Sequence, residues 1–374
     1  MVIPQWGRAA STYFTSNPSV PTVVDLYAPI LNEYLFVEPS IATYSFARVL
    51  PRIAKALQKG DYFICGNQSQ VYYYLGMLAI LGRITPLTYG KDLISIVPYC
   101  VPNRPPNRRT DTALLRGKYV DEDDKVVLWC GGLYPWFDFE TALKAMKLVA
   151  SETNSIKMIV VGAKNPKAEL VLVNKYQEAI NKAKAMELLG KTVFFIDWVP
   201  FELLEQIYLE SDVAINLHGL HLETIFSLRT RVIDSLWAGL PVISTTGDEL
   251  AELINKHKAG ISVPPYSHHH VQEAILTILN DKNLRDLMAS NSRRLAIDKF
   301  AASSAAKPLN EFCKQPRFAN DKNSPNYKLV TSRVQPRINH LIDFLVMLYY
   351  ARKAYKSMGI LYLKKKIFEF LKFG

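Results

Sequence analysis

The stretch SLRTRVIDSLWAGLPVIS, residues 227–244, has the pattern of an amphipathic helix that runs into a buried strand. We expect the helix to begin near Ser227 and to end at Gly239, with the strand starting at Pro241. Its first turn then carries Arg229 and Arg231, although a helix N-terminus has partial positive charge and disfavours cations. A local rule broken in this way often marks a functional site, and an anionic ligand would make both arginines favourable.

The alternation of strand and helix extends outward from this stretch over most of the chain. Short runs rich in β-branched and apolar residues are separated by longer helical patterns, which is typical of parallel sheets covered on both faces. The expected strands are 22–27, 61–66, 94–99, 125–132, 156–163, 192–199, 213–218 and 241–245.

The segment 101–111 is rich in proline and basic residues and has no periodic pattern, so we expect a linker there. From 125 to 300 the strand–helix rhythm is regular, and after 301 it stops. We therefore predict an α/β chain with a partial N-terminal domain, a linker, a complete C-terminal domain, and a loop followed by a basic helical tail. The boundaries are 1–104, 105–124, 125–300 and 301–374.

The composition is that of a globular protein: 374 residues, 49% hydrophobic and 21% charged, with a net charge of +11. The basic balance favours anionic partners such as phosphorylated small molecules or a membrane surface. The four cysteines form no C-x-x-C pair, so neither a zinc site nor a disulfide scaffold is expected, and a cytoplasmic location fits. The N-terminus does not resemble a signal peptide, and the apolar run 341–351 is too short to span a bilayer.

Ligands of open parallel sheets bind beyond the carboxyl ends of the strands, and several polar or glycine residues are predicted to lie there. Gly131 and Gly132 follow one strand, and the alternative to a binding role is an ordinary tight turn. Asp234 lies three residues after Arg231 on the same helix face, where it would either pair with that arginine or accept hydrogen bonds from sugar hydroxyls. The remaining candidates at strand ends are Lys164, His218, His221, Glu223, Gly247 and Asp248, each of which also has a purely structural interpretation.

Two clusters that resemble metal ligands are given structural interpretations. The acidic run 121–124 precedes a strand and so lies at the amino edge of the sheet, away from the carboxyl edge where ligands bind. We therefore predict a solvated turn. The run 267–270, Ser-His-His-His, reads as the cap and start of a helix. We expect no metal and no other cofactor.

The C-terminal tail has a different character from the rest of the chain. Between 331 and 374, nine Lys and Arg residues are opposed by Asp343 and Glu369, which leaves +7 of the total +11. Ile360, Leu363 and Ile367 recur at helical spacing beside the lysines, a pattern typical of helices that bind anionic membrane surfaces. The alternative is a helix packed across the α/β domains. No nucleic acid is expected, because no recognition motif accompanies the charge.

In combination, these segments resemble the GT-B glycosyltransferases, and family 4 in particular. The resemblance is carried by VVLWCGGLYPWFDFETALKAM, VVGAKNP, IDWVPFELLEQIYLESDVAINLH and ETIFSLRTRVIDSLWAGLPVISTTGD, and covers about 125–260. It implies a pair of Rossmann-type domains and transfer of a sugar from a nucleotide-diphosphate sugar to a glycan or glycolipid acceptor. The transfer would be retaining, in the cytoplasm and possibly at the inner membrane face.

The resemblance also assigns roles to residues. Asp234 matches the second acidic residue of the E-x7-E signature and would hold the ribose, whereas Glu223, the nearest match to the first, is eleven residues away. The usual Arg and Lys after the glycine turn are absent, so Arg229 and Arg231, with Lys164 as a further candidate, are expected to replace them. The full expected site comprises Arg229, Arg231 and Glu223 as catalytic residues and Gly131, Gly132, Trp136, Lys164, His218, Asp234, Gly247 and Asp248 as donor ligands.

One departure concerns the N-terminal domain, since the usual first strands and their glycine loop are not recognisable before residue 104. Either this domain is reduced or the true start lies upstream of Met1. Two alternatives to a transferase therefore remain: an impaired relative that acts as a binding partner, and a sugar-nucleotide epimerase, which shares the two-domain architecture.

Overall fold

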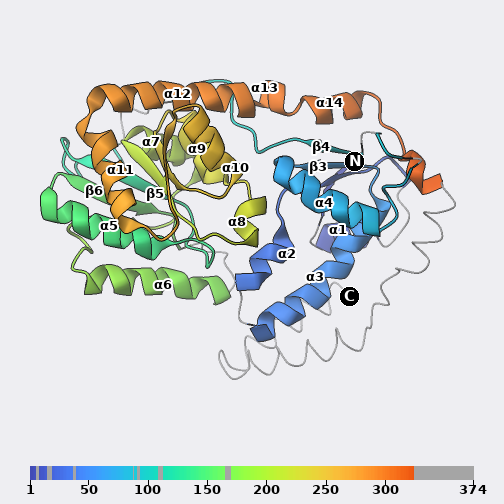
Figure 1. Cartoon of the computed structure of the whole chain (residues 1–374), viewed down its shortest axis with the longest axis horizontal. Coiled ribbons are helices and arrows are strands. Elements are labelled where there is room, and N and C mark those ends of the chain that lie inside the picture. The colour runs from blue at the N-terminus through green and yellow to red at the C-terminus, as the bar shows by residue number, and fades with distance from the viewer. Residues whose placement is uncertain are drawn as a thin grey trace.

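The computed structural model describes residues 1–5, 8–14, 19–36, 39–86, 88–90, 93–107, 113–164 and 170–323. They form two α/β domains that lie side by side, each built on a parallel sheet (Figure 1). The predicted fold class is therefore confirmed for these residues. The predicted basic tail, residues 331–374, lies outside the described residues.

The N-terminal sheet has the order β1-β2-β3-β4, and its strands are β1 (Val2–Pro4), β2 (Val23–Asp25), β3 (Tyr62–Cys65) and β4 (Ile94–Ile96). Every pairing is parallel, and strand β1 was not foreseen from the sequence. The helices of this domain are α1 (Arg8–Tyr13), α2 (Ile30–Glu33), the 3₁₀ turn Tyr34–Phe36, α3 (Pro39–Lys59) and α4 (Gln68–Ile80).

The C-terminal sheet has six strands in the order β10-β9-β8-β5-β6-β7. They are β5 (Lys125–Cys130), β6 (Ile156–Val161), β7 (Val193–Ile196), β8 (Val213–Asn216), β9 (Val242–Thr245) and β10 (Gly260–Val263), the last of which was also not foreseen. The chain moves outward from β5 in one direction and returns to β8 on its other side. Ligands of such sheets bind at this reversal, beyond the carboxyl ends of β5 and β8.

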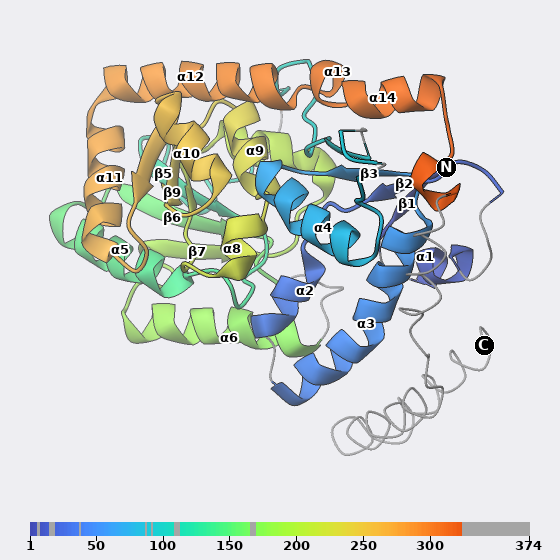
Figure 2. The same cartoon turned by 45° about the vertical axis from the view of Figure 1, so that its right-hand side comes forward.

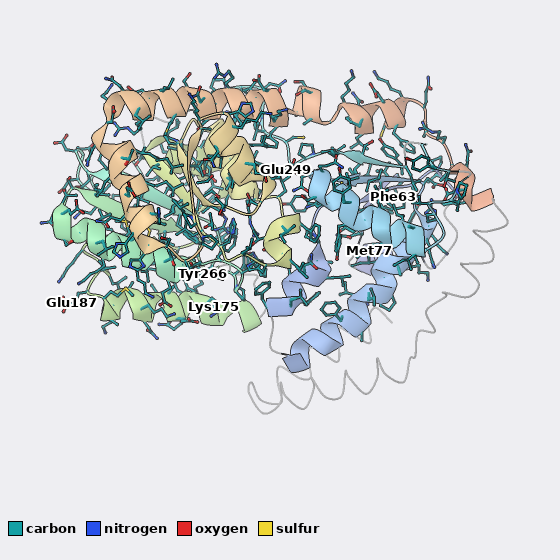
Figure 3. All side chains as sticks on the ribbon, viewed as in Figure 1. Phe63, Met77, Lys175, Glu187, Glu249 and Tyr266 are labelled. Atoms are coloured by element: carbon teal, nitrogen blue, oxygen red, sulfur yellow. The ribbon has the colours of Figure 1, made fainter. Side chains whose placement is uncertain are left out.

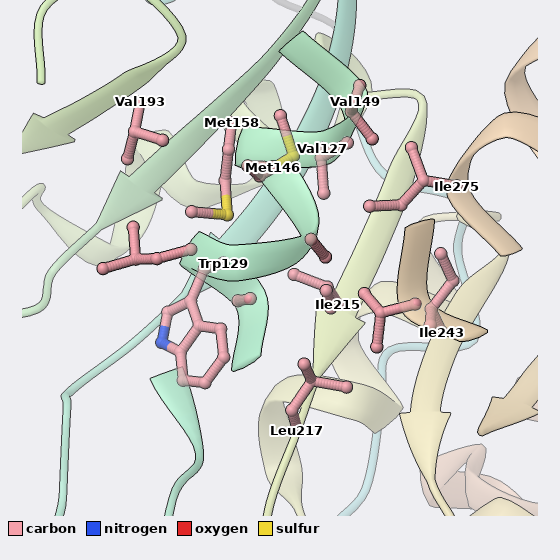
Figure 4. Close-up of a cluster of buried hydrophobic side chains, with 14 of the residues drawn as sticks. Val127, Trp129, Met146, Val149, Met158, Val193, Ile215, Leu217, Ile243 and Ile275 are labelled. Atoms are coloured by element: carbon pink, nitrogen blue, oxygen red, sulfur yellow. The ribbon is translucent and has the colours of Figure 1, made fainter. Parts of the chain in front are cut away.

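Helices cover both faces of the C-terminal sheet. Successive side chains of a strand point to opposite faces, and in these strands both sets are apolar. Trp129 points into one apolar layer together with Met146 and Ile275 (Figure 4), while its neighbour Leu128 packs into the other with Leu236. The covering helices are α5 (Phe139–Glu152), α6 (Leu170–Ala185), α7 (Leu204–Leu209), α9 (Thr230–Trp237), α10 (Glu249–Lys256) and α11 (His268–Asn280). The short helix α8 (Leu222–Phe226) packs instead against α4 and α2 of the N-terminal domain.

The helix expected to start near Ser227 begins three residues later, and that prediction is wrong. Ser227 instead ends helix α8 in extended backbone conformation, and its carbonyl accepts a hydrogen bond from Asn67 Nδ2 at 3.0 Å. Arg229 is consequently the N-cap residue of α9, while Arg231 lies in its first turn. The segment between the two helices is held extended by contacts with the other domain, which sequence periodicity does not reveal.

A final helical strap, α12 (Lys282–Phe300), α13 (Ala302–Ala305) and α14 (Lys307–Lys314), runs along one side of both domains (Figures 1 and 2). Val101, between the domains, exchanges backbone hydrogen bonds with Phe300 and Ala302 at 2.8 and 3.1 Å. Farther along, the ring of Phe312 stacks on Tyr62 with centroids 4.5 Å apart. The strap thus joins the C-terminal domain to the N-terminal sheet.

Helix α4 also brings the domains together, at its N-terminus. Gln70 Nε2 donates to the carbonyl of Phe226 at 2.9 Å. Glu249, which is labelled beside the end of α4 in Figure 3, accepts at Oε2 from the backbone N–H of Gln68 at 3.2 Å. These bonds place the segment that carries the two arginines against the N-terminal domain.

Candidate active site at the domain interface

A pocket opens between the two domains beside the N-terminus of α9. The N-terminal domain contributes the segment after β2 and the end of α2, and the C-terminal domain contributes the turn after β5 and the α8–α9 segment. Its lining residues are Tyr27, Ala28, Pro29, Glu33, Tyr134, Trp136, Phe137, Glu223, Ser227, Leu228, Arg229, Thr230 and Arg231.

Arg229 forms a bidentate ion pair with Glu223 in the wall of this pocket. Nη1 and Nη2 donate to Oε1 and Oε2 at 2.6 and 2.7 Å, and both side chains are buried. The hydroxyl of Ser227 donates to Glu223 Oε1 at 2.6 Å. The charge of Arg229 is therefore already compensated within the protein, in the fork-to-fork geometry that makes such pairs strong.

Arg231 is in a different position. Its Nη2 donates to the carbonyl of Gly132 at 3.0 Å, and its guanidinium lies 4.1 Å from the ring centroid of Phe137. Nη1 is buried, and none of the described residues accepts a hydrogen bond from it. Burial lowers the pKa of this guanidinium to about 10. A desolvated cation with a free donor at a pocket wall favours a negatively charged ligand.

The glycine turn after β5 is shaped around this arginine. Gly131 has φ +111°, and a Cβ there would lie 3.0 Å from Arg231 Nη2. The backbone N–H of Gly131 donates to the carbonyl of Val161 at 2.7 Å, so it is not free for a ligand. A Cβ on Gly132 would lie 2.9 Å from the ring of Tyr134. Gly131 needs glycine because of its positive φ, whereas a Cβ at Gly132 would require the ring of Tyr134 to shift. The turn supplies Arg231 with the carbonyl of Gly132 and keeps the N–H of Gly131 bonded to Val161.

Asp234 is brought to the same sheet edge but lies outside the pocket lining. Its carboxylate accepts a hydrogen bond from the hydroxyl of Tyr99, which follows β4 in the other domain. Burial raises the pKa of Asp234 to about 6. Arg231 and Asp234 both act electrostatically on Cys130, the last residue of β5. The two charges therefore stand together at the carboxyl end of the central strand.

The other candidates at strand ends have internal partners. His218 is fully buried, with Nε2 3.3 Å from Asp248 Oδ2, and Asp248 Oδ1 caps α10 by accepting from Ala251 N at 2.8 Å. Gly247 has φ +113°, and a Cβ there would lie 2.7 Å from Leu220. His218 lies in the connection from β8 to α8, and Gly247 and Asp248 lie in the connection from β9 to α10.

His221 and Trp136 are linked on the other side of the pocket. His221 caps α8 by accepting the N–H of Thr224 at Nδ1 (3.1 Å), which leaves Nε2–H to donate to the carbonyl of Trp136 at 3.1 Å. Burial lowers the pKa of His221, in keeping with this neutral tautomer. Lys164 is exposed, with Nζ 6.0 Å from the ring centroid of Tyr176, and does not line the pocket.

Some lining residues were not foreseen. Glu33, at the end of α2, has no motif around it in the sequence; burial and the nearby Glu223 raise its pKa to about 7. Tyr134 stacks on Trp136 with ring centroids 4.9 Å apart. The position of Tyr134 in the glycine-turn motif was a signal that sequence reasoning did not use.

The described residues contain neither a metal-binding cluster nor a membrane-spanning helix. No group of three or more His, Cys, Asp or Glu side chains in that part of the chain is arranged to hold a metal ion. Among the same residues, no helix combines the length and apolar character needed to cross a bilayer.

Comparison with known proteins finds a family match for the C-terminal domain. Residues 112–295 match the model of the family described as glycosyl transferases group 1. An uncharacterized glycosyltransferase of Methanocaldococcus jannaschii is 21% identical over 189 residues, which are 50% of this chain. Those residues are 44% of that relative, so the chain matches less than half the length of the curated protein.

Solved structures share the two-domain architecture. HepE from Anabaena, in complex with UDP and glucose, is 16% identical with a TM-score of 0.62, over 82% of this chain and 74% of that one. WaaG, a glycosyltransferase involved in lipopolysaccharide biosynthesis, is 15% identical with a TM-score of 0.58, over 80% of each chain. Sucrose-phosphate synthase from Thermosynechococcus elongatus is 16% identical with a TM-score of 0.58, over 79% of this chain and 67% of that one. At these identities the likeness establishes the GT-B fold.

Proposed function

We propose that this chain is a glycosyltransferase of the group 1 type, which transfers a sugar from a nucleotide-diphosphate sugar to a glycan or lipid-linked acceptor with retention of configuration. The observation that carries the proposal is Arg231, whose buried Nη1 has no partner among the described residues beside the turn after β5. The complexes of HepE with UDP and glucose add support from a protein of the same fold.

Arg231 is the residue that would stabilise the departing diphosphate. When the bond between the sugar and the diphosphate breaks, negative charge grows on the phosphate oxygens. A guanidinium that is already desolvated and oriented by Gly132 and Phe137 needs no reorganisation to meet that charge. The ion pair between Arg229 and Glu223 then acts as a support, because it fixes the segment from which α9 starts.

Asp234 is assigned to the nucleoside part of the donor. It lies one helical turn beyond Arg231, and its carboxylate is partly exposed. A carboxylate can accept hydrogen bonds from both hydroxyls of a ribose. The hydroxyl of Tyr99 orients it from the side of the N-terminal domain.

A binding screen tests this proposal. Unfolding temperatures of the purified chain are measured with UDP-glucose, GDP-mannose, ADP-glucose and dTDP-glucose, since a ligand of the native state raises stability by mass action. We expect one nucleotide class to give a selective shift that disappears in Arg231→Met. Absence of any shift at millimolar ligand would refute a donor site, and conversion of the bound donor without an acceptor would identify an epimerase instead.

We also infer from the sequence of the tail that the enzyme works on an anionic membrane surface. The support is the +7 charge of residues 331–374 together with their apolar helical spacing. In sedimentation assays we expect the chain to bind vesicles that contain phosphatidylglycerol and to leave them at high salt, because salt screens this attraction. Equal binding to pure phosphatidylcholine vesicles would contradict the inference.

A further inference from the structure

We infer that Glu33 binds a hydroxyl group of an uncharged acceptor sugar, on the side of the pocket opposite Arg231. The inference rests on the proposed function and extends it to the class of acceptor. Glu33 is the last residue of α2 in the N-terminal domain, and it lines the pocket that Arg231 lines from the C-terminal domain. The two side chains therefore face one cavity from different domains.

Within the part of the chain that the structure describes, the carboxylate of Glu33 has no hydrogen-bond donor or ion-pair partner, although the side chain is largely withdrawn from solvent. Burying an unpaired carboxylate costs several kcal/mol on general grounds. A carboxylate held at this cost in a pocket wall is available to a ligand, as buried unpaired polar groups at functional sites commonly are.

The charges around Glu33 decide what kind of ligand it accepts. The groups that act on it are Glu223 and Arg229 of the C-terminal domain, which neutralise each other as an ion pair, and Tyr27 of its own domain. Once Arg231 faces the donor diphosphate, the charge left in the pocket is that of Glu33. A second anion is then repelled, whereas a hydroxyl donates to the carboxylate in a charge-assisted hydrogen bond.

Aromatic rings complete a wall suited to a sugar. Trp136 and Tyr134 are stacked with their planes 19° apart, and Phe36, three residues after Glu33, meets Trp136 edge-on at 6.4 Å. Apolar walls with few, precisely placed polar groups are typical of sites for small polar ligands. The apolar faces of a sugar ring fit against such rings while one of its hydroxyls reaches Glu33.

Isothermal titration tests this assignment in two steps. The first measures binding of UDP, GDP, ADP and dTDP to the full chain; failure of all four refutes the donor site itself. The second adds methyl glycosides of glucose, galactose, mannose, rhamnose and N-acetylglucosamine, and methyl glucuronide and galacturonide, to protein saturated with the nucleotide that binds. We expect an uncharged glycoside to bind at least tenfold more tightly than either uronate.

Variants separate the role of Glu33 from a structural one. Glu33→Gln should weaken binding of the best glycoside at least tenfold and leave nucleotide affinity within twofold. In the wild type we expect glycoside affinity to rise between pH 6 and 8, and in Glu33→Gln it should not depend on pH over this range. The matched control is Glu249→Gln, which removes another raised-pKa carboxylate of the domain interface that lies outside the pocket. Unchanged glycoside affinity in Glu33→Gln, tighter binding of a uronate, or no glycoside binding at all would overturn the inference.

Discussion

Replacing Arg231 by Met is expected to make the ligand-free protein more stable and to remove most of its affinity for a nucleotide diphosphate. Burial lowers the pKa of Arg231 to about 10, and this lowering from its ordinary value corresponds to about 3 kcal/mol of penalty on the charged form at 1.36 kcal/mol per pKa unit. Because the pKa of a base is lowered, the penalty is complete at neutral pH and fades only as the pH rises above about 10.

Part of this gain is offset by contacts that Met cannot make. The hydrogen bond from Nη2 to the carbonyl of Gly132 is charge-assisted and contributes about 1.5–2 kcal/mol. Met keeps most of the packing against Phe137. The net expectation is a stabilisation of about 1 kcal/mol, measured by urea unfolding at pH 7.5 without ligand.

Arg229→Met is the matched control, two residues away. Removal of the Arg229 guanidinium leaves Glu223 buried without its partner, so the free energy of unfolding should fall by about 3–5 kcal/mol. Titration with UDP, or with whichever nucleotide diphosphate binds, should show a loss of about 10–100-fold for Arg231→Met, as expected for one charge-assisted contact. If Arg231→Met instead destabilises the protein by more than 1 kcal/mol and binds the nucleotide as before, the charge of Arg231 is structural and the reasoning is refuted.

Three further outcomes are expected. Asp234→Asn should weaken nucleotide binding yet stabilise the free protein by up to about 3 kcal/mol above pH 6, because burial raises the pKa of this acid to about 6. Below pH 4 the stability should be unchanged, and urea unfolding at pH 4 and 8 checks the sign. Gly131→Ala should lower both stability, by about 1–3 kcal/mol, and nucleotide affinity, since φ is +111° and a Cβ would lie 3.0 Å from Arg231; thermal unfolding and titration measure the two effects. Phe312→Ala should destabilise the protein by about 3 kcal/mol through loss of the stack on Tyr62 and leave nucleotide affinity unchanged. Calorimetry measures the first effect and titration the second, and a fall in nucleotide affinity would contradict the prediction.

The sequence by itself determined the βα order of the chain and the class of its fold. Runs such as 125–132 and 156–163 are nearly continuous in apolar residues, with Lys125 and Lys157 as the charged exceptions. That pattern is typical of a parallel strand covered on both faces. Gly239, with φ +79°, ends helix α9 as predicted, and Asp138 and Asp248 cap α5 and α10. These features are local: they depend on backbone conformation and on side chains within a few residues.

Tertiary structure alone decided what the two arginines do. In the sequence Arg229 and Arg231 look equivalent, yet Arg229 turns to Glu223 of the preceding helix while Arg231 turns to the glycine turn a hundred residues earlier. Glu33 lines the same pocket from the other domain, and no sequence motif around it predicted this position. A charge's role depends on which partners surround it and how much water is excluded, and both are properties of the packed chain.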